Sequence, residues 1–441
     1  MENVNIFWFR RDLRIDDNHG LFQALNAGLH VVPVFIFDPA ILSQFPDPND
    51  ARLTFIYQSL CGLDLEFRKY NSSLQVYFSS PEVVFGRLAA KYSIQTVYSN
   101  SDYEPEAFTR DQKVAKLLQD KGIEFLSFKD QIIFHQDEVI KSNGKPYTVF
   151  TSYGKKWKET LATQSIPDFS SEHHLANLKH LSAEYFPELQ EIGYQVQNIQ
   201  FPEKTFDPLL IENYAKTRDF PGINGTSRLG IHLRFGTISI RKLTRFAQIH
   251  SEVFLNELIW RNFYMDILWH FPHVVEKSFK PAYDFIPWLN NESDFERWCT
   301  GQTGYPLVDA GMRELNGTGY MHNRVRMVVA SFLTKHLLID WRWGESYFAS
   351  KLLDYELASN SGGWQWASGS GCDAAPYFRI FSPELQAKRF DPQMKYIRKW
   401  VPEIETSNYS KPMVDHSFAR LRAIETYRKM LKNYQEVVIK N

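Results

Sequence analysis

Residues 358–383, ASNSGGWQWASGSGCDAAPYFRIFSP, concentrate glycine, tryptophan and polar side chains. Trp364 and Trp366 flank one glutamine, and a glycine pair precedes them. Glycine lets a backbone approach a flat or charged group, and large aromatic side chains pack on rings. Polar residues lie among this apolar material: Asp354, Glu356, Asn360, Asp373 and Arg379. Because buried polar groups need hydrogen-bond partners, the stretch favours a bound polar ring system over a tight turn in a core.

A second stretch could bind an anion. Thr226, Ser227, Arg228, Leu229 and Gly230 follow a glycine-containing turn and lead into a predicted helix. Hydroxyl groups, free amides at a helix N-terminus and an arginine suit phosphate or pyrophosphate. An ordinary helix cap is the more common use of such residues, and the pattern alone leaves both interpretations open.

Residues 256–270, NELIWRNFYMDILWH, predict a helix with Glu257, Arg261 and Tyr264 close on one face and Trp260 beside them. A Glu–Arg pair at this spacing is commonly a surface ion pair worth about 0.2–0.5 kcal/mol. With two aromatic rings alongside, the same group could form the wall of a cavity for a flat, hydrogen-bonding ligand.

Residues 321–327, MHNRVRM, repeat this combination on another predicted helix. Asn323 and Met327 are one turn apart, with Arg324 and Arg326 between them. Asparagine in mid-helix is a poor helix former, so we expect Asn323 to have a specific partner. His322, a lone histidine, is expected to be structural.

The composition limits the class of protein. A chain of 441 residues exceeds one ordinary core, so two domains are expected. The net charge of −1 means that any nucleic-acid surface must be a local basic patch. Three cysteines without paired spacing argue against a disulfide framework or zinc site and fit a reducing cytosol. With no long apolar run or signal-peptide pattern, we expect a cytoplasmic protein.

The elements that position these residues fall into two groups. Apolar runs at 5–9, 31–37, 74–78, 96–99 and 124–128 predict strands, with helices near 50–70, 81–91 and 105–121 between them. This alternation predicts a doubly wound parallel α/β domain over residues 1–130. No GxGxxG follows the first strand, so a Rossmann dinucleotide site is not supported. Residues 131–206 lack sustained periodicity and predict an interdomain connector, and residues 207–441 predict an all-α domain.

Together these segments resemble the DNA photolyase/cryptochrome family, most of all the bacterial class I cyclobutane pyrimidine dimer (CPD) photolyases. The resemblance extends from WFRRDLRIDDN to FDPQMKYIRKWVPEI and includes GTSRLG, NELIWRNFYMD, GYPLVDAGMREL and GYMHNRVRM. It implies an FAD-dependent lyase that repairs CPDs in DNA by light-driven electron transfer from reduced, anionic FAD. One FAD would bind in a folded form in the all-α domain.

The resemblance also implies roles for single residues around FAD. Tyr214 and the stretch 226–230 would contact its phosphates and sugar, and Arg326 and Asp354 would form an ion pair beside the isoalloxazine. Asn360 would face the reactive ring nitrogen. Tyr355 and Glu356 complete the implied cofactor set. Glu356 replaces the aspartate common in close relatives, and Ser361 replaces a common asparagine.

For the substrate, the resemblance implies a flipped-out dimer in a cavity. Arginines at the rim would hold DNA phosphates, namely Arg218, Arg261, Arg324 and Arg379. Trp260 and Trp366 would pack on the dimer, with Tyr264 nearby and Met327 against the bases. Glu257 and Asn323 would hydrogen-bond the pyrimidines, with Glu257 a donor only when protonated. Glu257, Asn323, Met327 and Asn360 are thus the implied catalytic residues.

Trp364, Trp341 and Trp288 match the family's tryptophan chain, ordered from the flavin to the surface. In the α/β domain the key glutamate of folate-binding relatives falls at Ala107, so a folate antenna is in doubt. A deazaflavin, another flavin or no antenna remain open. No obligate protein partner is expected, and the chain should be a monomer without a metal.

The main alternative is a cryptochrome, a blue-light photoreceptor with the same fold and FAD but no repair activity. The intact set of Glu257, Trp260, Asn323, Met327 and Trp366 favours repair. Met327 stands where (6-4) photoproduct repair uses a histidine, which disfavours that activity. A nucleotide-binding protein that works through its α/β domain would leave the polar and aromatic residues of the helical half unexplained.

Overall fold

The computed structural model describes residues 2–182 and 185–440. The chain forms two compact units, each assembled from separate segments of the sequence. The first unit comprises residues 1–138, 159–206 and 228–249, and the second comprises residues 139–158, 207–227 and 250–441. The domain boundaries drawn from the sequence, at residues 130 and 206, stay a prediction.

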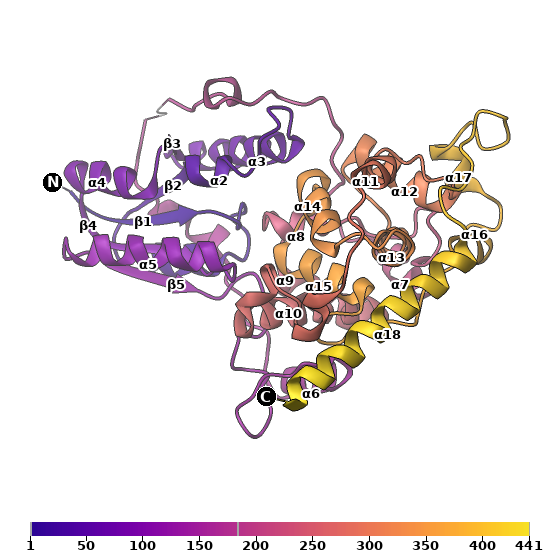
Figure 1. Cartoon of the computed structure of the whole chain (residues 1–441). Coiled ribbons are helices and arrows are strands. Elements are labelled where there is room, and N and C mark those ends of the chain that lie inside the picture. Colours follow the sequence, from indigo (N-terminus) through magenta and orange to yellow (C-terminus); the bar gives the residue numbers. More distant parts are fainter. Residues whose placement is uncertain (1, 183–184, 441) are drawn as a thin grey trace. The chain divides into compact units, whose positions relative to one another are not determined.

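One parallel sheet organises the first unit, with strand order β3-β2-β1-β4-β5. The strands are β1 (Asn3–Phe9), β2 (Val31–Phe37), β3 (Gln75–Phe78), β4 (Ser93–Asn100) and β5 (Glu124–Phe128). Helices connect successive strands, as parallel pairing requires (Figure 1): α1 (His19–Leu25), α2 (Pro39–Leu42), α3 (Ala51–Arg68), α4 (Pro81–Lys91) and α5 (Pro105–Gln119). The predicted α/β fold is confirmed, and α1 and α2 are helices that the sequence patterns did not reveal.

Both faces of the sheet are covered, which explains why β1 reads as a continuous apolar run. Successive side chains of a strand point to opposite faces. Ile6 and Trp8 accordingly pack in one cluster with Phe85 of α4 and Val114 of α5. Phe9 contacts Phe67 of α3, with ring centroids 6.0 Å apart.

The remaining helices lie after β5. They are α6 (Phe150–Thr163), α7 (Pro208–Thr217), α8 (Gly230–Arg234), α9 (Ile240–His250), α10 (Glu252–His270), α11 (Glu292–Cys299), α12 (Pro306–Thr318), α13 (Asn323–Ser331), α14 (Trp341–Lys351), α15 (Leu357–Ser368), α16 (Pro383–Phe390), α17 (Lys395–Trp400) and α18 (His416–Lys440). Short 3-10 turns η1 to η4 lie at Ser171–Asn177, Leu189–Ile192, Pro272–Val275 and Pro281–Phe285, and a π-helical turn η5 spans Phe332–His336. The described residues beyond β5 form no further strand of the sheet, so the predicted helical character of the C-terminal half is confirmed.

The predicted connector contains a helix that the sequence analysis missed. In α6, Tyr153, Trp157 and Leu161 are spaced four residues apart, and all three are buried. This is the apolar stripe of an amphipathic helix. The stripe is only one residue wide among polar neighbours, which is why it did not stand out.

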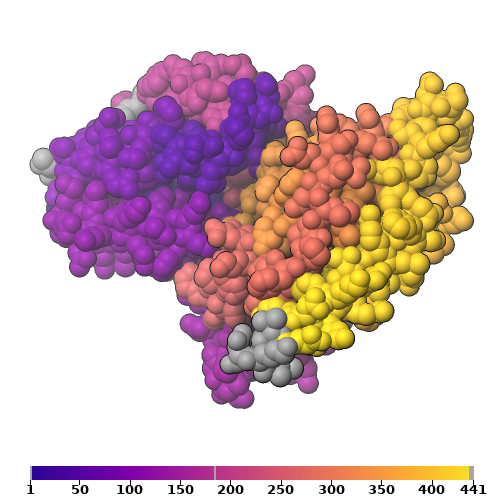
Figure 2. All heavy atoms as spheres, in the orientation of Figure 1, coloured from indigo at the N-terminus to yellow at the C-terminus, as the bar shows by residue number. Residues whose placement is uncertain are grey.

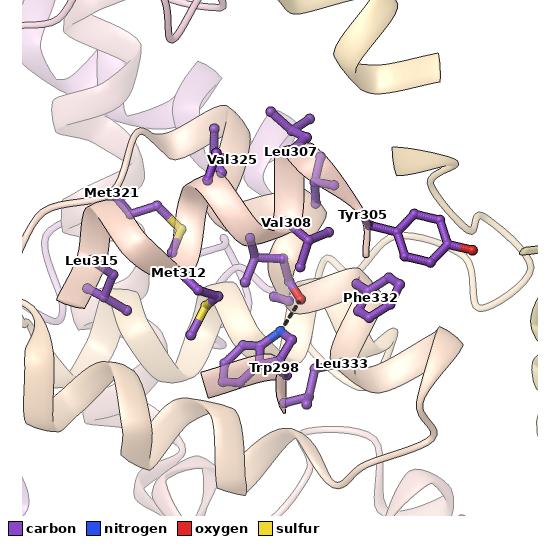
Figure 3. Packing of buried hydrophobic residues seen from close by; sticks show 14 of the residues in the cluster. Trp298, Tyr305, Leu307, Val308, Met312, Leu315, Met321, Val325, Phe332 and Leu333 are labelled. Atoms are coloured by element: carbon purple, nitrogen blue, oxygen red, sulfur yellow. Dashed lines mark hydrogen bonds between the residues drawn. The ribbon is translucent and has the colours of Figure 1, made fainter. Parts of the chain in front are cut away.

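The core of the second unit centres on Trp298 of α11 (Figure 3). Its ring is fully buried among Met312, Leu315, Phe332 and Leu333, and its indole N–H donates to the carbonyl of Val329 at 3.2 Å. Because that N–H has a hydrogen-bond partner, the large ring is buried without leaving a polar group unpaired. The last helix, α18, runs along the outside of this unit (Figures 1 and 2).

A buried ionic network ties the first unit together beyond its sheet. Asp130, which follows β5, accepts two hydrogen bonds from Arg14, at 2.7 and 2.8 Å, and one from Arg241 of α9 at 2.8 Å. Arg241 also donates to Asp17 at 3.1 Å. Burial opposes ionisation of Asp130, but the two arginines outweigh it and lower its pKa to about 2.

We expect Asp130→Asn to lower the free energy of unfolding by about 3 kcal/mol, because it leaves two buried arginines without their shared anion. A lowered carboxyl pKa stabilises the fold above the ordinary pKa, and this contribution is lost as the pH falls through the folded value. The deficit of the variant should therefore shrink between about pH 5 and pH 2, measured by urea unfolding at each pH.

Asp137→Asn is the control, because Asp137 is exposed in the same segment and should leave stability unchanged within about 0.5 kcal/mol. A deficit of Asp130→Asn that stayed constant over this pH range would contradict the assignment.

Candidate functional site

Helix α15 packs closely against two neighbouring helices through glycine. A β-carbon on Gly362 would lie 2.2 Å from the ring of Tyr264 in α10, and one on Gly344 of α14 would lie 2.1 Å from the ring of Trp364. No real side chain tolerates such contacts, so both positions require glycine. The glycine pair noted in the sequence lies inside a helix, not in a turn, and its first member serves helix packing.

The second member, Gly363, faces open space: a β-carbon there would meet nothing within 4 Å. One turn earlier lies Asn360, whose amide nitrogen donates to the Glu345 carboxylate at 2.8 Å and to the Glu345 backbone carbonyl at 3.1 Å. Within residues 2–182 and 185–440, nothing donates to the amide oxygen of Asn360. Burial raises the pKa of Glu345, with the Asn360 hydrogen bond acting in the opposite direction.

Arg326 of α13 and Asp354, which precedes α15, form the ion pair expected from the sequence. Arg326 donates to both carboxylate oxygens, at 2.9 and 3.0 Å, and to the Met321 carbonyl at 2.7 Å. Burial disfavours the cation, but Asp354 outweighs it and raises the pKa of Arg326, so the guanidinium stays charged. The Arg326 guanidinium also lies 5.8 Å from the ring centre of Tyr320.

The predicted anion-binding stretch is divided between the units. Thr226 lies in the second unit, with its hydroxyl 3.1 Å from the Tyr320 hydroxyl, and Ser227 follows it. Residues 228–230 lie in the first unit, where Arg228 has a left-handed backbone with φ of 52° and Gly230 begins α8. Tyr214 of α7 packs edge-on against Phe254, and burial, reinforced by Glu257, raises its pKa.

The second unit therefore contains residues that fit a large polar ring ligand. Three features lie on or next to helices α13 and α15, which pack on each other. They are the open space beside Gly363, the amide oxygen of Asn360, which has no donor among the described residues, and the Arg326–Asp354 pair. The other residues of the predicted cofactor set, Tyr355 and Glu356, lie between Asp354 and α15, with Glu356 as the N-cap residue of that helix. The Arg326 guanidinium and the Asn360 amide suit the polar edge of a ring.

Glu257 of α10 forms an ion pair with Arg218, the C-cap residue of α7. Burial raises the pKa of Glu257, and Arg218 opposes this effect without cancelling it. Four residues along α10, Arg261 lies 3.5 Å from the carboxylate of Glu356. Together with Arg324, which pairs with Asp219, three of the four predicted DNA-contacting arginines thus face carboxylates.

Trp260 of α10 and Trp366 of α15 each pack on a phenylalanine ring. Trp260 stacks on Phe150 with ring centroids 3.6 Å apart, and the Phe150 backbone N–H donates to Asp373 at 2.8 Å. Trp366 of α15 stacks on Phe381 at 6.4 Å, and the exposed Arg379 lies 5.6 Å from the same ring. Both tryptophans are half-buried, so each keeps free surface.

On α13 the structure corrects one expectation. Asn323 is the first residue of the helix and is exposed, so the expectation that it lies in mid-helix was wrong. His322 is the N-cap and accepts from the Arg324 backbone N–H at 3.1 Å, as a structural histidine would. Arg324 pairs with Asp219 at 2.5 Å and lies 3.9 Å from the sulfur of Met327.

The three predicted electron-transfer tryptophans share the core of the second unit. Trp364 and Trp341 are 2% and 1% exposed, and the half-buried Trp288 packs against the same cluster. This burial order agrees with a chain that ends near the surface at Trp288. The indole N–H of Trp341 is buried without a partner among the described residues.

Several contacts at this site were not found from the sequence. Phe150, Asp219 and Tyr320 meet their partners only in the tertiary structure. Glu345 did leave a signal, because it lies four residues after Trp341 and three before Phe348, both buried, so it faces the core side of α14.

Within the described residues, no group of three or more His, Cys, Asp or Glu side chains could hold a metal ion, and no helix is long and apolar enough to cross a membrane. All three cysteines are free thiols.

Comparison with known families accounts for both halves of the chain. Residues 5–171 match the family described as DNA photolyase, and residues 254–408 match the FAD binding domain of DNA photolyase. The deoxyribodipyrimidine photo-lyase of Synechococcus is 37% identical over 428 residues, which cover 90% of this chain and 88% of that protein.

Solved structures give the same result. A bacterial class III photolyase from Agrobacterium tumefaciens superposes with a TM-score of 0.87 and 31% identity, covering 98% of each chain. A Synechocystis cryptochrome gives a TM-score of 0.82 at 27% identity, covering 98% of this chain and 99% of its own. The fold is therefore shared with a photolyase and with a cryptochrome. On sequence identity over nearly its whole length, this chain belongs to the DNA photolyase family and contains that family's FAD-binding domain.

Proposed function

We propose that this protein is a deoxyribodipyrimidine photo-lyase that uses light and reduced FAD to split cyclobutane pyrimidine dimers in DNA. The observation that carries the proposal is the set Glu257, Trp260, Asn323, Met327 and Trp366. These residues lie on α10, α13 and α15, and α15 packs on both other helices. The full-length similarity to photolyases supports the same conclusion.

FAD would be held by the residues beside Gly363. The Arg326–Asp354 pair would bind the polar edge of the ring, Asn360 would present its amide oxygen, and Tyr214, Tyr355, Glu356 and residues 226–230 would hold the rest. The bound, reduced and anionic FAD, one per chain, supplies the electron that light transfers to the dimer. The identity of an antenna chromophore, a monomeric state and a place on DNA in the cytosol stay predictions.

Damaged DNA is the substrate that this site suits. A dimer is weakly stacked and paired, so flipping it out of the duplex costs less than flipping sound bases. Trp260 and Trp366 offer partly exposed rings for its apolar edge, with Tyr264 behind them and Met327 against the bases. Arg218, Arg261, Arg324 and Arg379 would then exchange their protein partners for phosphates or for the lesion.

Glu257 would act as a hydrogen-bond donor to a pyrimidine carbonyl, where negative charge develops. Only the protonated carboxyl can donate, and the raised pKa of Glu257 moves it toward that form. DNA binding removes further water from the site, and Arg218 is free to turn to a phosphate. Asn323, exposed at the start of α13, would bond the second base through its amide.

A cryptochrome without repair activity is the second candidate, supported by the similar Synechocystis fold. One assay distinguishes a photo-lyase from a cryptochrome. The purified, reduced protein should restore thymine monomers in a dimer-containing oligonucleotide under blue light, and not in the dark. A protein that binds FAD but splits no dimers would support the photoreceptor instead.

We expect Glu257→Ala to lower the affinity for dimer-containing DNA by about fivefold, because it removes one hydrogen bond worth about 1 kcal/mol. Fluorescence anisotropy with damaged and undamaged oligonucleotides would measure this. The loss should be confined to the damaged strand.

The pH dependence tests the protonation state of Glu257. Since the neutral carboxyl is the donor and its pKa is raised, repair per absorbed photon should increase as the pH falls toward that pKa. Glu257→Gln donates at every pH and should flatten the profile. If repair by the glutamine variant depended on pH as steeply as repair by the parent, the carboxyl group of Glu257 would not be the hydrogen-bond donor.

Gly344→Ala tests the tryptophan chain by displacing the ring of Trp364, which packs against the backbone of Gly344. The added methyl group would lie 2.1 Å from the Trp364 ring and 2.6 Å from Leu333, so the ring must move. We expect a loss of about 2 kcal/mol in stability, typical of overpacking, and slower photoreduction of bound oxidised flavin, measured by absorbance under blue light. Trp364→Phe should lose photoreduction without this steric cost.

Gly363→Ala is the matched control for stability, since its methyl group meets no atom within 4 Å. It should keep or raise the unfolding midpoint, because alanine is the better helix former. Equal destabilisation by both substitutions would show that the ring contact at Gly344 is not the cause.

A further inference from the structure

A cavity in the first unit has no part in the proposed function. It lies at the carboxyl end of β5, between the segment that follows this strand, the first residue of α1, the end of α6 and Arg241 of α9. All of its lining residues belong to the first unit. Crevices outside the carboxyl ends of parallel strands are the usual ligand sites of open α/β sheets. Ala107, where folate-binding relatives carry their key glutamate, is not among the lining residues.

The walls of this cavity are mostly apolar and partly flat. Six apolar side chains line it: Ile132, Ile133, Phe134, Leu161, Ile166 and Phe169. The ring of His19, whose pKa burial lowers so that it is neutral at pH 7, stacks on the Phe169 ring with centroids 3.6 Å apart. The cavity encloses about 90 Å³, whereas one water molecule needs about 10–15 Å³ of such space. It therefore has room for a single ring with one substituent.

One buried donor in the wall has no partner among the described residues. The side chain of Arg241 is 4% exposed. Its Nε donates to Asp17 at 3.1 Å, and its Nη2 donates to Asp130 at 2.8 Å. Because Nε and Nη2 form one edge of the planar guanidinium, Nη1 points away from both carboxylates. No described residue accepts from Nη1, so a ligand in the cavity would meet a buried cationic donor with unused N–H groups.

The charges around Arg241 are already balanced. Two buried arginines, Arg14 and Arg241, are matched by two buried carboxylates, Asp17 and Asp130. Lys129, the other cation of the wall, has a carboxylate partner of its own at 2.5 Å. A carboxylate ligand would lie near two other carboxylates and lose its water in an apolar cavity, which one shared cation does not offset. A neutral carbonyl oxygen accepts from Nη1 without adding a charge.

We propose that this cavity binds an uncharged single-ring amide or lactam, whose carbonyl oxygen accepts from Nη1 of Arg241 and whose ring packs between the apolar walls. The site is separate from Arg326, Asp354 and Asn360, which belong to the second unit. A single ring of this kind does not absorb blue light, so the ligand is not an antenna chromophore. The inference goes beyond the proposed function and does not depend on it.

Benzamide is the probe, and benzoate and isopropylbenzene are its charged and apolar counterparts of nearly the same shape. A saturation-transfer NMR titration of the full-length protein, with FAD present in excess to keep the probes out of the flavin site, measures the three dissociation constants. We expect about 0.1–1 mM for benzamide, typical of a ligand this small. Benzoate should bind about tenfold more weakly or worse, because it brings an unmatched charge. Absence of saturable benzamide binding, or benzoate binding as tightly, would overturn the proposal.

Two tryptophan variants locate the site. Ile166 is half-buried in the wall, so Ile166→Trp should fill the cavity and lower the affinity for benzamide about tenfold or more. Ala162→Trp is the matched control, because Ala162 is exposed on α6 and does not line the cavity. It should keep the affinity of the parent within about twofold. Equal affinities in the two variants would place benzamide elsewhere and contradict the assignment.

Arg241→Lys tests the donor. Lysine keeps the charge that Asp17 and Asp130 need, but it has no second edge of N–H groups for a ligand. The ratio of the affinities for benzamide and isopropylbenzene should therefore fall about tenfold, the effect of one hydrogen bond to a charged group. An unchanged ratio would overturn the role of Nη1. If the lysine variant does not fold, a crystal structure of the parent with benzamide decides, because its oxygen must lie within about 3 Å of Nη1.

Discussion

The close approach of α15 to α10 and α14 is the constraint on which the site depends. Tyr264 lies on the backbone at Gly362, and Trp364 lies on the backbone at Gly344. Because protein interiors are closely packed, two such contacts between a ring and a backbone fix the rotation of α15 about its axis and its position along that axis. Asn360, Gly363 and Trp366 gain their positions from this packing. A helix with two adjacent glycines is intrinsically weak, so tertiary contacts must stabilise it.

Charge pairing is the second organising feature. Arg218, Arg261 and Arg324 are predicted DNA contacts, and each already faces a carboxylate, of Glu257, Glu356 and Asp219. In a chain with a net charge of −1, these carboxylates hold the arginines in place without creating a strong positive field. DNA phosphates must then compete with them, so the net gain from each contact is smaller than for an unpaired arginine. Under the proposed function, this arrangement would favour recognition of the lesion over tight binding to any DNA.

Sequence patterns predicted the parallel sheet and the helical half, whereas the family resemblance implied the ion pair of Arg326 with Asp354. The apolar run 31–37 set the limits of a strand because every residue of β2 is buried. The patterns failed where partners are distant in sequence: Phe150 on Trp260, Asp219 on Arg324 and Glu345 on Asn360. They also failed for α6, whose narrow stripe resembles a loop, and for Asn323, which begins a helix instead of occupying its middle. Helix ends depend on capping contacts that periodicity does not encode.

The order of residues within α15 explains how one helix can serve two ring systems. Successive residues are turned by about 100°, so residues two apart point in nearly opposite directions. Trp364 is accordingly buried in the core of the second unit, while Trp366 is half-exposed beside Phe381 and Arg379. Asn360 lies one turn before Trp364, on the side where Gly363 leaves open space. Placing the tryptophans at adjacent positions, or one turn apart, would turn both toward neighbouring faces and lose this separation. The spacing of WQW therefore places its two tryptophans on opposite sides of α15, which is the geometry that the proposed roles in electron transfer and substrate binding require.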